Sequence, residues 1–198
     1  MIAILDYGAG NLRSVANTLD EIGAPYEVRT TPDALETFDK VILPGVGHFG
    51  QMTRAMDDRG LRSAIHGYVA SGKPFLGICV GLQCLFESSE EAPDEKGLGL
   101  FPGVVARFPS SARVPQMGWN SLTQVKDSAL LEGLGADPYV YFANSYYAPL
   151  NDATSALCYY EVPFTAALQH KNVYAVQFHP EKSGPVGLQV MRNFVQSC

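Results

Sequence analysis

A cysteine between two glycines is the first candidate for chemistry in this sequence. Cys79 lies in the stretch Gly77-Ile78-Cys79-Val80-Gly81, where a short apolar run meets residues at helical spacing. The run at residues 74–78 is typical of a strand buried on both faces. A side chain at so tight a junction projects from the sheet edge, and the flanking glycines remove atoms that would clash there. Amides at the start of the next helix would favour the thiolate and bind an oxyanion.

A histidine and a glutamate near the end of the chain form the second candidate. The run at residues 173–177 predicts a strand, and side chains two apart on a strand share a face. His179 and Glu181 would then supply a general base and the carboxylate that orients its ring. With Cys79 they would complete a Cys-His-Glu arrangement for nucleophilic catalysis. Two structural alternatives remain open here: Cys79 as a small buried apolar residue, and His179 as a capped or surface histidine.

A glycine-rich turn at residues 44–50 follows a third apolar strand. Its glycines have the GxGxxG spacing of dinucleotide-binding turns. However, Pro44 stands at the turn, the strand is not the first, and no strand ending in an acidic residue follows about 20 residues later. We therefore interpret the turn as backbone that presents N–H groups to a substrate oxyanion. The alternative is a loop turn without a ligand.

The first half of the chain alternates predicted strands with predicted helices, which indicates an α/β fold. A mostly parallel central sheet with helices on both faces is expected. Asn11 is expected to cap the first helix. The strands are expected at residues 2–5, 26–29, 41–43 and 74–78. The helices are expected at residues 12–22, at 49–71 with a break near Gly60, and after Cys79 through Phe86. Turns after three of these strands would share the carboxyl edge, where ligands bind.

The second half has a different texture and should add an antiparallel or mixed sheet. Strand-like runs occur at residues 104–108, 117–123, 139–142, 156–161, 165–169 and 173–177. Residues 88–99 predict a surface loop, residues 128–131 a helical turn and residues 187–195 a closing helix. No domain boundary is evident, so a single domain over residues 1–198 is expected.

Composition and charge exclude several classes of function. The 198 residues carry a formal charge of −6 without a basic cluster, so no nucleic acid partner is expected. No apolar run approaches the ~20 residues that span a bilayer, and the first residues do not resemble a signal peptide, so no membrane association is expected. The four cysteines form no CxxC pair, which indicates a cytoplasmic location. The four histidines lack ligand spacing, and we expect neither a metal nor another cofactor.

Three motifs in one chain resemble those of class I (triad-type) glutamine amidotransferases. They are PGVGHFG at residues 44–50, GICVGLQ at residues 77–83 and HPEKS at residues 179–183. Together with DYGAGNLRSV at residues 6–15 and VPQMGWN at residues 114–120, they are similar to one branch of that family. This branch supplies the glutaminase subunits of imidazole glycerol phosphate synthase, in histidine biosynthesis. The resemblance covers nearly the whole chain and implies a flavodoxin-like fold.

The resemblance implies a role for each matching residue. Cys79 would attack the carboxamide carbon of glutamine, His179 would take and return the proton, and Glu181 would orient His179. The oxyanion would be held by backbone N–H groups of Val80 and of Val46 or Gly47. The residues that would bind glutamine are Gly47, Gln83, Ser145 and Tyr146. Two departures from the usual pattern, His48 and Asn144, leave the triad untouched.

The resemblance also implies a partner. The ammonia would pass into a (β/α)₈-barrel cyclase subunit docked over the active site as a heterodimer. There it would react with a phosphorylated ribosyl-formimino-carboxamide nucleotide, giving imidazole glycerol phosphate and aminoimidazole carboxamide ribotide. The positions that match the interface are Asn11, Trp119, Asn120, Tyr141 and Lys182. For Trp119 the alternative is core packing, and for Lys182 it is a solvated surface charge.

Two other functions remain open from the sequence. A different glutaminase subunit, such as one that serves pyridoxal phosphate synthesis, would bind a different partner. A non-catalytic interaction protein would keep the fold and an oxidisable cysteine. The presence of both His179 and Glu181 argues against this second alternative.

Overall fold

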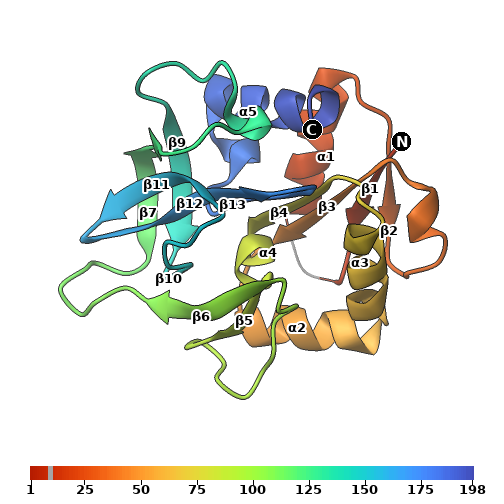
Figure 1. Cartoon of the computed structure of the whole chain (residues 1–198), viewed down its shortest axis with the longest axis horizontal. Helices are drawn as coiled ribbons and strands as arrows, with labels where there is room; N and C mark the ends of the chain where they lie inside the picture. The colour runs from red at the N-terminus through yellow and green to blue at the C-terminus, as the bar shows by residue number, and fades with distance from the viewer. Residues whose placement is uncertain (9–10) are drawn as a thin grey trace.

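A mixed eight-stranded sheet runs through the molecule, in the order β2-β1-β3-β4-β13-β12-β11-β8 (Figure 1). The computed structural model describes residues 1–8 and 11–198, so residues 9 and 10 of the predicted first turn lie outside the described residues. The parallel strands are β1 (Ile2–Leu5), β2 (Tyr26–Arg29), β3 (Lys40–Gly45), β4 (Phe75–Cys79) and β13 (Val173–Val176). The antiparallel extension consists of β12 (Val162–His170), β11 (Thr154–Tyr160) and β8 (Thr123–Gln124). The predicted parallel sheet with an antiparallel addition is confirmed.

Helices cover both faces of this sheet, as predicted. Figure 1 shows α1 and α5 on one side and α2 and α3 on the other. The helices are α1 (Leu12–Ile22), α2 (Phe49–Asp58), α3 (Leu61–Ala70), α4 (Val80–Gln83) and α5 (Gly184–Gln196). Helix α1 ends because Gly23 adopts a left-handed conformation with φ of 75°, which costs glycine little. Each helix in the described part of the chain is too short or too polar to cross a membrane.

Smaller elements complete the fold. A three-stranded sheet joins β5 (Phe86–Ser89), β6 (Phe101–Arg107) and β10 (Tyr146–Tyr147), and a two-stranded sheet joins β7 (Gln116–Ser121) and β9 (Tyr139–Asn144). The short 3₁₀ helices are η1 (Leu35–Thr37), η2 (Ala129–Leu131) and η3 (Pro180–Lys182). The expected helical turn at residues 128–131 corresponds to η2.

Two predictions around residue 86 were wrong. Helix α4 ends at Gln83 instead of continuing through Phe86, and residues 88 and 89 belong to β5 instead of a loop. Phe86 is completely buried and pairs with Phe101 of β6. A short apolar run is buried in a helix and in a strand alike, so its periodicity could not separate the two. Pairing with β6, which is distant in sequence, decided the outcome.

The carboxyl ends of β1, β3, β4 and β13 meet at one edge of the sheet. The order β2-β1-β3-β4-β13 is the flavodoxin-like order, whose ligands bind at this edge. Residue pairs such as Gly45–Cys79 in β3–β4 and Val176–Ile78 in β13–β4 align the strand ends. The turns that follow these strands therefore lie close together at this edge, as predicted. For the first turn this statement covers only its described residues.

Candidate active site

Cys79 ends β4 in a strained backbone conformation. Its φ of 56° and ψ of −110° are unusual for a residue with a side chain, and such strain costs about 1–3 kcal/mol. A methyl group at Gly77 would lie 2.7 Å from the Gly81 oxygen, and one at Gly81 would lie 2.2 Å from the Leu43 oxygen. Only glycines allow this approach, so the predicted strand-turn-helix junction is present. Since α4 is a single turn, its dipole aids the sulfur less than the predicted longer helix would.

Cys79 and His179 line one cavity of about 320 Å³ at the carboxyl edge. The predicted substrate and oxyanion residues all line it with them: Val46, Gly47, Val80, Gln83, Ser145 and Tyr146. Lys182, predicted at a partner interface, also reaches it. The sequence analysis missed Glu91, Pro115 and Ala143, and noted Asn144 only as a departure from the family. Nothing in the local sequence separates Glu91 from the other acidic residues around it.

His179 and Glu181 form a buried pair, but not for the predicted reason. Nδ1 of His179 lies 2.8 Å from Oε1 of Glu181, with the two side chains 3% and 1% exposed. Strand β13 ends at Val176, and the pair belongs to the turn that opens η3 rather than to a strand face. Asn11 was expected to cap α1, yet its side chain makes no cap and donates to Glu181 Oε1 at 3.0 Å.

The electrostatics of the pair favour a charged histidine. Burial alone would lower the pKa of His179, but the sulfur of Cys79 and the carboxylate of Glu181 outweigh it and raise the pKa to about 10. Burial also acts to raise the pKa of Glu181, yet the hydrogen bond and charge of His179 lower it below its ordinary value. The buried carboxylate of Glu181 therefore stabilises the protonated form of His179.

Hydrogen bonds through the backbone and the Ser183 hydroxyl fix His179 to β9. The His179 N–H donates to the Tyr141 oxygen at 2.9 Å. The Ser183 hydroxyl donates to the His179 oxygen at 2.6 Å and accepts from the Tyr141 N–H at 2.9 Å. Ser183 is 1% exposed and was not singled out by the sequence, because its use depends on β9 lying beside η3. The β7–β9 sheet and the histidine are thereby held together.

The predicted oxyanion turn does not offer all of its amides to the cavity. The N–H of Val46 donates to the hydroxyl of Tyr7 at 3.3 Å. Tyr7 follows β1, is 3% exposed and was not assigned a role from the sequence. Burial raises the pKa of Tyr7, which keeps its hydroxyl neutral. The amide of Val46 is thus engaged within the protein.

The predicted interface residues lie in three separate places. Trp119 on β7 is 54% exposed, so the core-packing alternative was wrong. Its ring meets that of Tyr141 edge to face at 6.2 Å, and Lys182 Nζ lies 6.0 Å from the Tyr141 ring. Asn120 follows Trp119 on the strand and so points to the opposite face, where it donates to the Tyr159 oxygen at 3.1 Å. Asn11 is hydrogen-bonded to Glu181 beside the histidine.

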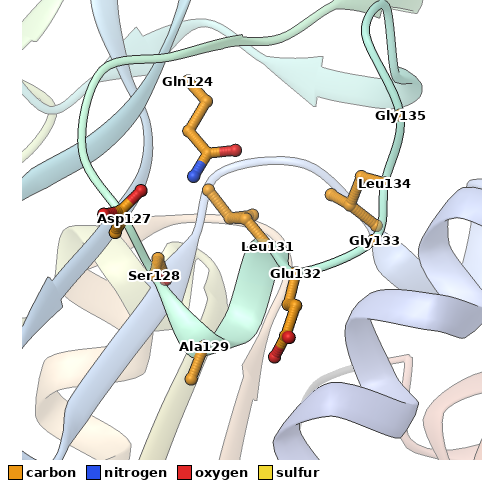
Figure 2. Close-up of a pocket in the computed structure, with 9 residues that line it drawn as sticks. All are labelled: Gln124, Asp127, Ser128, Ala129, Leu131, Glu132, Gly133, Leu134 and Gly135. Carbon is orange, nitrogen blue, oxygen red and sulfur yellow. The ribbon is translucent and has the colours of Figure 1, made fainter.

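A larger hollow elsewhere lacks the groups for this chemistry. It measures about 530 Å³ and lies along residues 124–135, where Figure 2 shows Gln124, Leu131 and Leu134 turned toward its centre. Its lining residues include carboxylates, Asp127 and Glu132, but neither a cysteine nor a histidine. A nucleophile and a base meet instead in the cavity at Cys79.

Comparisons with known proteins agree with this geometry. The sequence model described as Glutamine amidotransferase class-I matches residues 3–198. The Imidazole glycerol phosphate synthase subunit HisH of Methanothermobacter thermautotrophicus is 53% identical over 197 residues, covering 99% of this chain and 98% of that protein. The chloroplastic Imidazole glycerol phosphate synthase hisHF of Arabidopsis thaliana is 45% identical over 201 residues, covering 98% of this chain and 34% of that protein.

A solved structure extends the likeness to the fold. PurLQS from Thermotoga maritima matches with a TM-score of 0.77 at 19% identity, over 98% of this chain and 96% of that one. At this identity the match speaks for the fold alone. The family model, in contrast, spans residues 3–198, a range that contains both Cys79 and His179. The chain belongs to the class I glutamine amidotransferase family.

Proposed function

We propose that this chain hydrolyses glutamine to glutamate and ammonia, as the glutaminase subunit of an imidazole glycerol phosphate synthase. The observation that carries the proposal is that Cys79 and His179 line one cavity, while the buried carboxylate of Glu181 lies 2.8 Å from His179 Nδ1. The identity of 53% to a HisH subunit and of 45% to a hisHF protein supports the choice of synthase over other glutaminase partners.

The reaction follows from the positions of these three side chains. The Cys79 proton passes to His179, and the sulfur attacks the carboxamide carbon of glutamine. The tetrahedral intermediate collapses as His179 protonates the departing nitrogen, which leaves ammonia and a thioester. His179 then takes a proton from water, the hydroxide attacks the thioester, and glutamate leaves as the proton returns to the sulfur. Glu181 orients the histidine ring and stabilises its charged form whenever it carries the proton, and Asn11 holds the Glu181 carboxylate in place.

The cavity carries groups that suit glutamine. Its volume of about 320 Å³ lies in the range of small-ligand pockets, roughly 300–1,000 Å³. Glu91 places a carboxylate on its wall, which we assign to the α-ammonium group of the substrate. One oxygen of Glu91 accepts from the Phe49 N–H at 2.7 Å, so the carboxylate is held in place. Gly47, Ser145 and Tyr146 contribute the remaining walls.

We propose that the oxyanion is held by the amides of Val80 and of the turn at residues 46–47. The Val80 amide follows the nucleophile directly, as in a nucleophile elbow. The amide of Val46 is the second candidate donor, and in the free chain it donates to Tyr7 instead. Hydrolysis would then idle until the partner releases that amide. One missing donor lowers the rate by roughly 10²–10³.

We propose that the cyclase subunit docks on the exposed face of the β7–β9 sheet, forming a heterodimer. This docking face comprises Met117, Trp119, Tyr139, Tyr141 and Lys182, and three of its residues are large and more than half exposed. Exposed aromatic and apolar side chains of this kind are typical of interfaces. Lys182 belongs both to this face and to the cavity wall, so ammonia could leave directly into the partner. The four free cysteines suit a cytoplasmic setting.

A glutamate-release assay tests the proposal. The chain is mixed with a barrel cyclase subunit and its nucleotide substrate, and glutamate is measured with and without each component. We expect turnover that requires Cys79 and that rises when both additions are present. Cys79→Ala should abolish glutamate release while the melting temperature stays close to that of the unaltered chain. Absence of glutamate in the full mixture would refute the proposed activity.

A further inference from the structure

Two buried glutamine side chains form a hydrogen-bonded chain that ends at the sulfur of Cys79. Gln177 follows β13 and is 0% exposed, and Gln83 closes α4 and is 3% exposed. Gln177 Nε2 lies 3.6 Å from Cys79 Sγ, and Gln177 Oε1 lies 3.0 Å from Gln83 Nε2. Gln83 Nε2 also lies 2.9 Å from the backbone oxygen of Tyr146. The three contacts connect the backbone of β10 to the candidate nucleophile.

The direction of this hydrogen-bonded chain follows from the chemistry of its ends. The backbone oxygen of Tyr146 can only accept, so the side chain that faces it must present the Nε2 donor of Gln83. An amide nitrogen carries two hydrogens, and these two contacts use both. Gln177 must then turn its oxygen toward Gln83 and its nitrogen toward the sulfur. Rotating either amide by half a turn would set two acceptors or two donors against each other.

We propose that Gln177 is a catalytic residue that donates its side-chain N–H to Cys79 Sγ and stabilises the thiolate, while Gln83 positions the Gln177 amide. A donor to the charged form of a group favours that form. When the proton moves from Sγ to His179, the new negative charge on sulfur faces an imidazolium and an amide donor. Gln83 has no hydrogen left for glutamine, so it acts on the nucleophile rather than as a donor to the substrate.

The inference rests on the proposed function for what the sulfur attacks, but the contact itself can be tested without glutamine. Two buried amides could also serve the fold alone, since a buried polar group must find a partner. The deciding measurement must therefore read the state of the sulfur. Alkylation by iodoacetamide does so because the thiolate is the form that reacts. Cys84 shares a tryptic peptide with Cys79, so fragment-ion mass spectrometry is used to assign the label to Cys79 and to separate it from the other three thiols.

The test follows the pH midpoint of Cys79 alkylation in the free chain. Gln177→Met removes the donor at similar length, and Gln177→Glu keeps the shape but offers only acceptors when ionised. We expect the midpoint to rise by about one unit in Gln177→Met, which is tenfold less thiolate at a given pH. The rise should be larger in Gln177→Glu. With the cyclase partner present, kcat/KM for glutamine should fall about 10–100-fold, as for loss of a hydrogen bond to a charged group.

A matched control removes a glutamine from the same sheet. Gln169 lies on β12, and its Oε1 is buried without a partner among the described residues. Gln169→Met should leave the alkylation midpoint unchanged. An unchanged midpoint in a Gln177→Met chain with normal melting would overturn the proposal. If neither Gln177 variant folds, Gln83→Met decides in the same assay, because an unchanged midpoint there would equally overturn it.

The two proposals fail in different ways. If the unaltered chain and its partner release no glutamate but the midpoint still rises in Gln177→Met, the proposed function fails and the contact with the sulfur stands. If glutamate is released normally and the midpoint does not move, the glutaminase assignment stands and the role of Gln177 is refuted.

Discussion

Replacing Tyr7 with phenylalanine removes the oxygen that accepts the Val46 N–H in the free chain. The two atoms lie 3.3 Å apart, and Tyr7 is 3% exposed, so water cannot readily take the place of the hydroxyl. The buried amide then loses its partner, and an orientation toward the cavity becomes less costly. We therefore expect Tyr7→Phe to raise the glutaminase activity of the free chain.

The size of the effect follows from the bond that is lost. A neutral hydrogen bond contributes about 0.5–1.5 kcal/mol. At about 1.4 kcal/mol for each tenfold change in rate, the free chain should turn over about two- to twelvefold faster. The upper limit is the roughly 10²–10³ that a complete oxyanion donor supplies. Turnover with the partner and its nucleotide should hardly change, because the amide is already released there, so the activation ratio should fall.

The assay compares glutamate release by the free chain and by the complex, at saturating glutamine. Tyr68→Phe is the matched control, because Tyr68 is 2% exposed and its hydroxyl donates to the Phe38 oxygen, also at 3.3 Å, away from the cavity. That variant should lose comparable stability and gain no activity. A Tyr7→Phe chain with unchanged or lower basal turnover and normal melting would refute the restraint assigned to Tyr7.

Three further predictions concern the histidine, the elbow and the docking face. Because the pKa of His179 is raised to about 10, the imidazolium persists until the pH rises through that value. The alkaline limb of kcat/KM should accordingly lie near pH 10, and a limb near 6.5 would contradict it. Gly81→Ala should prevent folding of the elbow, seen as loss of soluble protein or of cooperative melting, since its methyl would lie 2.2 Å from the Leu43 oxygen. Native-like melting would count against that geometry. Trp119→Ala should weaken partner binding by about 2 kcal/mol, near 30-fold in Kd by calorimetry, with basal hydrolysis unchanged. Equal affinity would remove Trp119 from the docking face.

Local chemistry was enough to predict the parallel half of the fold and the elbow. Short apolar runs bounded by turn residues predict strands, and amphipathic segments of ten or more residues predict helices, so the regular alternation of the two in the first half indicated the parallel sheet. The glycines at positions 77 and 81 predicted a tight junction, and the structure shows that a Cβ at either position would clash with the backbone. The pairing of His179 with Glu181 was predicted correctly, although a 3₁₀ turn produces it instead of a strand face.

The residues that the sequence analysis missed depend on contacts between distant segments. Tyr7 accepts the Val46 N–H only because β1 lies beside β3. Gln177 contacts the sulfur of Cys79 only because β13 lies beside β4. Asn11 looked like a helix cap until the fold brought Glu181 within 3.0 Å of it, across 170 residues of chain.

By itself, then, the order of residues determined which side chains could react and which edge of the sheet would hold them. That information is local, because backbone geometry and apolar periodicity act over a few residues at a time. The tertiary structure alone decided which donors face the sulfur, which amide is engaged elsewhere and which aromatic side chains remain exposed. Those outcomes depend on how strands from both halves are ordered in one sheet, since that order sets which distant groups lie within hydrogen-bonding distance.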